Sequence, residues 1–124
     1  ECEREKIDFT YLDLPDNQKE INEVIAEAIR NGTDSFISLN SNSALYTLAA
    51  LNNAGVSVPQ DVRLISFDDN ESFEFMTPPI SALRQPISEI GLQAYARIYE
   101  RMKENKEPGK HFILSCSFIP RGSH

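Results

Sequence analysis

The stretch LISFDDNESFEFMTPPISALRQP, residues 64–86, decides the fold of this chain. It opens as a buried strand and then changes abruptly into acids, aromatics and a double proline. The acid pair Asp68 and Asp69 therefore lies at the carboxyl end of a strand. Because the residue before a proline is held out of the helical region, the prolines predict an extended connection after it. A polar strand mouth followed by a stiff connection indicates binding more than catalysis.

The composition is that of one soluble globular domain. The chain has 124 residues, of which 40% are hydrophobic and 25% charged, and its net charge of −7 disfavours direct binding of a phosphate backbone. No apolar run is long enough for a membrane span, and residues 1–4 are not followed by a signal region. We therefore expect a cytoplasmic protein, or a piece cut from a longer one. Cys2 and Cys116 lie far apart, which predicts neither a disulfide framework nor a zinc site.

Strands and helices alternate along the sequence. Alternating apolar residues predict a strand over 7–14, and a helical period from Ile21 to Ile29 predicts a helix that Gly32 ends. The later predicted elements are a strand over 35–39, a helix from Asn42 to Asn53 capped by Asn40 and Ser41, a strand over 62–67, a helix over 87–102, an exit at Pro108–Gly109 and a last strand over 112–119. Helices between strands imply right-handed crossovers. The predicted fold class is α/β, with a mainly parallel sheet between two helical layers.

Two polar motifs are predicted at one edge of this sheet. Asn40 follows the second strand and Asp68 follows the third, and ligands of parallel α/β sheets bind outside the carboxyl ends of the strands. An amide and a carboxylate together suit a vicinal pair of hydroxyls, as in a sugar or nucleoside. Ser41 and Asp69 are the neighbouring candidates. The alternatives are that Asn40 only caps a helix and that backbone N–H groups satisfy Asp68 at a turn.

Catalysis and metal binding have weaker support. Consecutive residues of a strand point to opposite faces, so Asp68 and Asp69 do not readily chelate one ion. No serine has a histidine near it in sequence, and the glycines are isolated, so we expect neither an enzyme nor a cofactor. A response-regulator receiver also carries an acid pair. Its pair follows the first strand, however, and here Asn40 stands where an acid is sought.

The segment LNSNSALYTLAALNNAGVSVPQDVRLISFDDNESFEFMTPPISALRQPISEIGLQAYARI, residues 39–98, resembles the effector-binding core of LacI/GalR-type transcriptional regulators. The resemblance is strongest over 33–105, fair at the terminal FIPRGS, and rests on pattern alone over 1–32. It implies a partial lobe of the type I periplasmic-binding-protein-like fold, with residues 1–124 as the C-terminal portion of an effector-binding and dimerisation domain. DNA binding is then the task of a helix-turn-helix that these residues do not include.

The resemblance also implies roles for residues. In such regulators an effector, commonly a sugar, lies between two lobes, and the positions of Asp68 and Asn40 contact it. The stretch from Pro79 to Gln85 crosses between lobes, and the helix near 86–105 belongs to a second lobe. The expected crossover residues are Pro79, Ser81, Leu83 and Gln85. Ser41 and Ser66 stand where many relatives have an acid and a glycine, so the effector chemistry of sugar-binding members does not carry over directly.

A homodimer is implied as well. The helix from Asn42 to Asn53 and the Phe73–Phe75 segment resemble the family's dimerisation surface, and ordinary core packing is the alternative. The expected contacts are Tyr46, Leu48, Phe73 and Phe75. We expect the apolar face of the helix over 87–102 to fold against its own lobe or to pair with a second copy.

Three functions stay open at this point. The first is the effector-binding part of a LacI-type regulator, without catalysis. The second is an exported sugar-binding protein of the same fold. The third is a small α/β enzyme or receiver domain.

Overall fold

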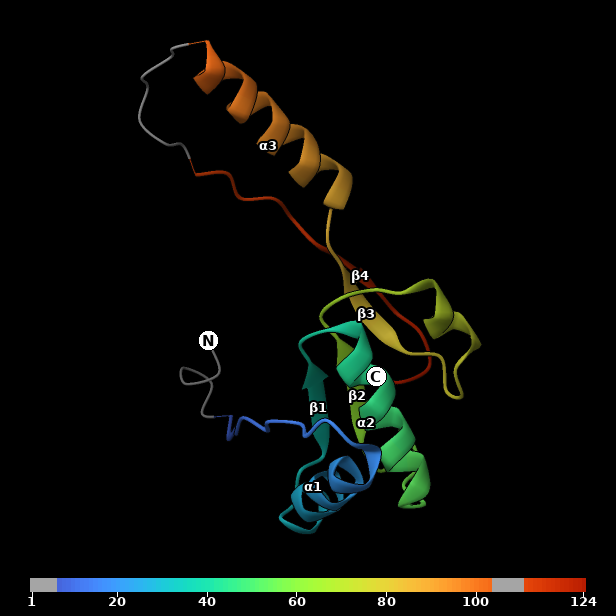
Figure 1. The fold of residues 1–124 in the computed structure, drawn as a ribbon. Helices are drawn as coiled ribbons and strands as arrows, with labels where there is room; N and C mark the ends of the chain where they lie inside the picture. Colours follow the sequence, from blue (N-terminus) through green and yellow to red (C-terminus); the bar gives the residue numbers. More distant parts are fainter. Residues whose placement is uncertain (1–6, 104–110) are drawn as a thin grey trace.

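A four-stranded sheet organises the molecule (Figure 1). The structure is a computed structural model that describes residues 7–103 and 111–124. The sheet order is β1-β2-β3-β4, and the strands are β1 (Ser35–Ser38), β2 (Arg63–Ser66), β3 (Ser81–Arg84) and β4 (Ser117–Ile119). β1, β2 and β3 are parallel, and β4 is antiparallel to β3. The predicted α/β class with a mainly parallel sheet is confirmed.

Two helices, α1 (Gln18–Arg30) and α2 (Ser41–Asn53), have the local signals that the sequence predicts. The side chain of Asn17 accepts a hydrogen bond from the N–H of Glu20 at 3.0 Å and caps α1. Gly32 and Gly55 follow the two helices with φ angles of 93° and 69°, which other residues rarely adopt. These helices therefore begin and end for local reasons.

The core lies where α1 packs on α2 and where α2 packs on β1 and β2. Its largest fully buried apolar side chains are Phe73, Ile21, Ile25, Leu51, Leu64 and Ile80. Burial of each such side chain contributes roughly 1.5–3 kcal/mol. On the other face of β1, Ile37 is 70% exposed. The face of β1 that carries Ile37 is therefore open to solvent at this residue.

Two predicted strands differ from the structure. The strand expected over 7–14 does not form, and Ile7, Phe9 and Tyr11 are exposed. The strand expected over 112–119 is limited to β4. Alternating apolar residues favour a strand only where a neighbouring strand pairs with the backbone, and a sequence pattern does not reveal that neighbour.

The stretch after β2 forms a short 3₁₀ helix, η1 (Glu71–Phe75), before the chain reaches β3. The connection that the prolines predict to be extended is extended only after η1, where residues Ser81–Arg84 form β3. The last residues return to this region. Buried Ser123 donates to the carbonyl of Leu64 at 2.6 Å and accepts from the N–H of Ser81 at 2.9 Å. The end of the chain thereby joins β2 to β3.

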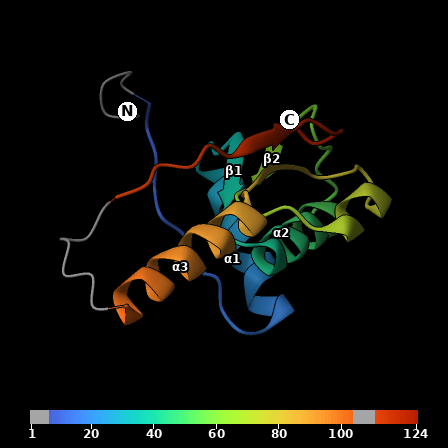
Figure 2. The same cartoon turned by 90° about the horizontal axis from the view of Figure 1, so that it is seen from above.

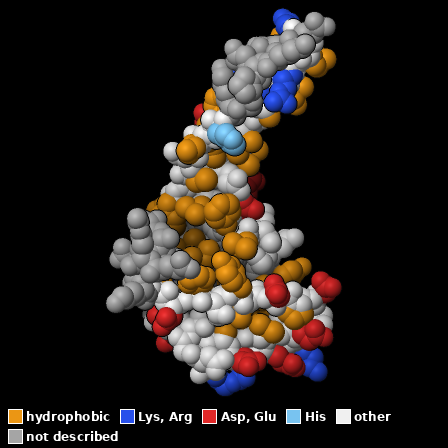
Figure 3. Space-filling model, turned by 90° about the vertical axis from the view of Figure 1, so that its left-hand side faces the viewer, with side chains coloured by type: hydrophobic (Ala, Val, Ile, Leu, Met, Phe, Trp, Pro, Cys, Tyr) orange, Lys and Arg blue, Asp and Glu red, His pale blue; other side chains and the backbone are white. Residues whose placement is uncertain are grey.

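Helix α3 (Ile87–Met102) extends away from the rest of the molecule (Figures 1 and 2). None of its residues is buried, so of the two expected arrangements packing against its own lobe is not observed, and pairing with a second copy stays a prediction. A contact that steadies it comes from Arg97, whose guanidinium lies 4.5 Å from the centre of the Phe112 ring. Figure 3 shows hydrophobic side chains gathered along this extension and at its base.

Three further points concern the described part of the chain. Cys116 is an exposed free thiol, whereas Cys2 and the expected exit at Pro108–Gly109 lie outside the described residues. None of the described helices is both long enough and apolar enough to span a membrane. Within residues 7–103 and 111–124, no group of three or more His, Cys, Asp and Glu side chains is placed to hold a metal ion.

Candidate functional site

The carboxyl ends of β1 and β2 meet at one edge of the sheet. The strands are parallel and in register, with Ser38 opposite Ser66. Asn40 and Asp68 each lie two residues beyond these partners, and the N–H of Phe67 donates to the carbonyl of Ser38 at 2.7 Å. Asn40 and Asp68 therefore occupy equivalent places on the same rim, as the sequence predicts.

A hollow of about 650 Å³ opens at this rim. It brings together the predicted Ser41, Asp68 and Asp69 with residues from the start of η1 and the end of β3. Its lining residues are Ser41, Asp68, Asp69, Asn70, Glu71, Arg84, Gln85 and Ile87. Asn40 is beside this lining and not part of it. The hollow therefore presents acceptors and donors from three separate stretches of the chain.

Asn40 acts as the N-cap of α2. Its side-chain oxygen accepts from the N–H of Ser43 at 2.9 Å, and the hydroxyl of Ser43 lies 3.4 Å from the N–H of Asn40. This is a capping box, which satisfies otherwise unpaired backbone donors of the helix. Asn40 therefore caps α2, and its predicted ligand role stays a prediction. Its amide nitrogen can still donate to a bound molecule.

Asp68 is held by a side chain from another strand. The amide nitrogen of Gln85 donates to Oδ1 of Asp68 at 2.5 Å, and the hydroxyl of buried Ser66 donates to the backbone carbonyl of Asp68 at 2.7 Å. The carboxylate partner is thus the Gln85 side chain and not the backbone N–H groups of a turn. A carboxylate has about four acceptor sites, so Asp68 retains acceptor capacity for a ligand hydroxyl.

Asp69 is bound to two arginines. Oδ2 accepts from Nε and Nη2 of Arg84 at 2.8 and 2.6 Å, and Oδ1 accepts from Nη1 of Arg121 at 2.8 Å. Burial alone raises the pKa of Asp69, but the hydrogen bonds and charges of Arg121 and Arg84 outweigh it, so the pKa lies below the ordinary 3.8. Both oxygens are engaged, so Asp69 has less to offer a ligand than Asp68 has. Its predicted ligand role stays a prediction.

Arg84, Gln85 and Arg121 complete these contacts. The family resemblance predicts Gln85 on the crossover and predicts no role for the two arginines. Nη1 of Arg121 also donates to the carbonyl of Ile80 at 2.7 Å, and its Nη2 lies 3.7 Å from the Glu74 carboxylate. The signal in the sequence was Asp69 itself, because an acid that follows a buried strand requires a cationic partner. The sequence alone does not identify which of the chain's arginines supplies it.

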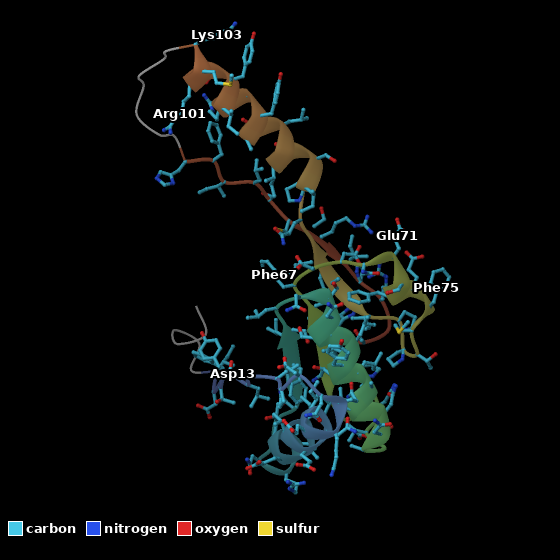
Figure 4. The ribbon with its side chains drawn as sticks, viewed as in Figure 1. Asp13, Phe67, Glu71, Phe75, Arg101 and Lys103 are labelled. Atoms are coloured by element: carbon cyan, nitrogen blue, oxygen red, sulfur yellow. The ribbon has the colours of Figure 1, made fainter. Side chains whose placement is uncertain are left out.

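The expected dimer residues separate into two classes. Leu48 is 3% exposed and Phe73 is fully buried in the core of the chain. Neither is available to a second copy, so for these two the alternative of core packing is correct. Tyr46 is half exposed on α2, and Phe75 is 81% exposed and points outward from η1 (Figure 4).

The structure also brings a serine and a histidine together. Oγ of Ser81 lies 2.8 Å from Nδ1 of His124, although the two are far apart in sequence. Ser81 is fully buried, and its oxygen also accepts from the N–H of Arg121 at 2.8 Å. A substrate has no access to this hydroxyl. The pair is therefore structural and does not resemble an activated nucleophile.

Comparison with known proteins identifies the family of this chain. Residues 1–124 match the family described as periplasmic binding protein-like domains. The chain is also 34% identical over 90 residues to the lactose operon repressor of Rhizobium radiobacter, an alignment that covers 73% of this chain and 79% of that protein. This chain belongs to the periplasmic binding protein-like family of the LacI-type regulators. The resemblance noted in the sequence is thereby confirmed.

Solved structures of LacI-family transcriptional regulators share the fold. One from Enterococcus faecalis, solved with bound ribose, superposes with a TM-score of 0.82 at 19% identity, and covers 98% of this chain and 46% of its own. One from Arthrobacter, solved in complex with lactose, superposes with a TM-score of 0.79 at 21% identity, with coverage of 98% and 46%. This chain therefore spans about half the length of these regulators.

Proposed function

We propose that this chain is the effector-binding and dimerisation core of a LacI-type transcriptional regulator, and that it binds a small carbohydrate at the rim of its sheet. The observation that carries the proposal is the in-register pairing of β1 and β2, which brings Asn40 and Asp68 to one edge beside the hollow. A carboxylate with spare acceptor capacity and the amides of Asn40 and Gln85 match the hydroxyls of a sugar. The ribose and lactose in the related structures support this chemistry.

DNA binding and dimerisation belong to the same proposal. The net charge of −7 disfavours DNA binding by these residues, so DNA contact requires a separate helix-turn-helix. Phe75 and Tyr46 are the exposed aromatic residues of the expected dimer surface. The named relatives are regulators, which favours this function over an exported sugar-binding protein and over an enzyme or receiver domain.

We further propose that α3 belongs to a second lobe, with β3 and residues 111–119 as the connections to it. Its apolar residues are exposed, as expected of a helix whose packing partner lies outside these residues. The crossover residues Pro79, Ser81, Leu83 and Gln85 lie in or beside β3, which leads directly into α3. Half of a two-lobed site retains about half of the favourable contacts. A site that binds at about 1 μM, roughly −8 kcal/mol, is then left with about −4 kcal/mol, or millimolar affinity.

The test is a titration of the chain with ribose and with lactose from about 1 mM upward, followed by amide chemical shifts in NMR spectra. We expect saturable shifts at residues 40–41 and 66–71 with at least one of the two sugars. Asp68→Ala should abolish these shifts. The matched control is Asp13→Ala, since Asp13 is exposed and distant from the hollow in Figure 4. Shifts of equal size in Asp68→Ala, or none in the native chain, would count against the proposal.

A further inference from the structure

A turn centred on one residue joins β3 to α3. Pro86 has φ −80° and ψ 65°, and the N–H of Ile87 donates to the carbonyl of Gln85 at 2.9 Å. These values are those of an inverse γ-turn. No side chain caps the start of α3. The direction in which α3 leaves the molecule therefore depends on what holds the few residues of this joint.

Gln85 is the residue of the joint that is attached to the rest of the molecule. Its amide donates to the carboxylate of Asp68 at 2.5 Å, which is a charge-assisted and therefore strong hydrogen bond. The Arg97 contact with Phe112 does not replace it, because residues 111–116 belong to the same extension. Among the described residues, the Asp68–Gln85 contact is thus the side-chain hydrogen bond that ties the joint to the end of β2.

Asp69, directly beside this contact, anchors the ends of the strands through two ion pairs. Arg84 is the last residue of β3, which leads into the extension, and Arg121 lies two residues beyond β4, which leads out of it. The side chains of Arg121 and Asp69 are both 8% exposed, so their ion pair is well shielded from solvent. The neighbouring carboxylates therefore have different tasks, since Asp69 holds both strands and Asp68 holds the joint.

We propose that the Asp68–Gln85 hydrogen bond is a latch that sets the direction of α3 relative to the strand ends that Asp69 holds together. Gln85 is then a positioning residue that acts through its amide. The consequence for regulation rests on the proposed function, in which Asp68 also contacts the effector. A ligand that displaces the Gln85 amide from Oδ1 of Asp68 releases the joint. One carboxylate thus detects the ligand and transmits its presence to α3.

The test measures the position of α3 without any ligand. Spin labels are attached at Glu27→Cys on α1 and Ala96→Cys on α3, both exposed sites, in a chain with Cys2→Ser and Cys116→Ser. The distance distribution is recorded by double electron–electron resonance. Ala96 lies about 14 Å along α3 from the joint, so each 10° of swing moves it by about 2 Å.

We expect one narrow distribution for the labelled chain and a distribution broader by about 5 Å for Gln85→Ala, which corresponds to a swing of roughly 20°. Asp68→Ala should behave in the same way. Asp68→Asn should retain the narrow distribution, because the asparagine oxygen still accepts from Gln85. Gln60→Ala is the matched control, since Gln60 is an exposed glutamine of another loop.

Three results would overturn the latch: an unchanged distribution in Gln85→Ala, broadening in Asp68→Asn equal to that in Asp68→Ala, or equal broadening in Gln60→Ala. Circular dichroism of each variant establishes that the sheet and the helices remain folded. Because no ligand is present, this outcome does not depend on whether ribose or lactose binds. Failure of the sugar titration and failure of the latch are therefore distinguishable.

Discussion

Replacement of Arg121 by methionine tests the ion pairs that hold the end of the chain. The Arg121 guanidinium binds the Asp69 carboxylate and the carbonyl of Ile80, and its side chain is 8% exposed. Arg84 binds the other oxygen of the same carboxylate, but its side chain is 57% exposed. The two arginines therefore share one partner in very different surroundings. Arg84→Met is the matched control.

The magnitudes follow from this difference in burial. Removal of one partner from a buried ion pair costs about 3–5 kcal/mol. Asp69 keeps Arg84 in the variant, so we expect Arg121→Met to lose about 2–4 kcal/mol. An ion pair of an exposed arginine is screened by water and contributes about 0–1 kcal/mol. Arg84→Met should therefore lose at most about 1 kcal/mol.

The assay is urea unfolding followed by circular dichroism, with the slope compared among variants. A double-mutant cycle with Asp69→Asn isolates the coupling of Arg121 to the carboxylate from other effects of the substitution. Equal losses in Arg121→Met and Arg84→Met would refute the assignment of the buried arginine as the principal partner. So would a coupling energy near zero in the cycle.

Three further outcomes are expected. Because the pKa of Asp69 is below 3.8 in the folded chain, its contribution to the free energy of unfolding is complete above about pH 4. This contribution is lost as the pH falls below that value. In urea unfolding at pH 2–5, the free energy of unfolding of Asp69→Asn should therefore fall less steeply with decreasing pH than that of the native chain. An equal dependence on pH in both chains would contradict this. Ser123→Ala removes two buried hydrogen bonds and should cost about 2–3 kcal/mol in urea unfolding, whereas Ser88→Ala, at an exposed position, should cost little. If the chain dimerises through η1, Phe75→Asp should shift sedimentation velocity toward the monomer without loss of stability, and an unshifted dimer would place the interface elsewhere.

Local signals explain what was predicted well. The helix predicted over 87–102 is observed with these bounds, since its apolar period and the proline before it are properties of neighbouring residues. Asn40 caps α2 for the same reason. The rim position of Asp68 was also predictable, because the carboxyl ends of parallel strands share one edge of the sheet.

Contacts between distant residues explain what was missed. The alternation over 7–14 is compatible with a strand, but a strand also requires a paired neighbour. Leu48 and Phe73 were predicted at a dimer interface and lie in the core. The sequence does not separate these two places, because apolar side chains occur in both.

By itself the sequence determined the order and type of the helices, the parallel sheet, and an acid pair at the mouth of β2. Only the tertiary structure decided what each acid does. Asp69 receives Arg121 from 52 positions away and becomes an anchor, while Asp68 receives Gln85 and keeps acceptor capacity for a ligand. Periodicity and capping act over a few residues and are visible in the sequence, whereas the partner of a charge is whichever group the fold brings within hydrogen-bonding distance.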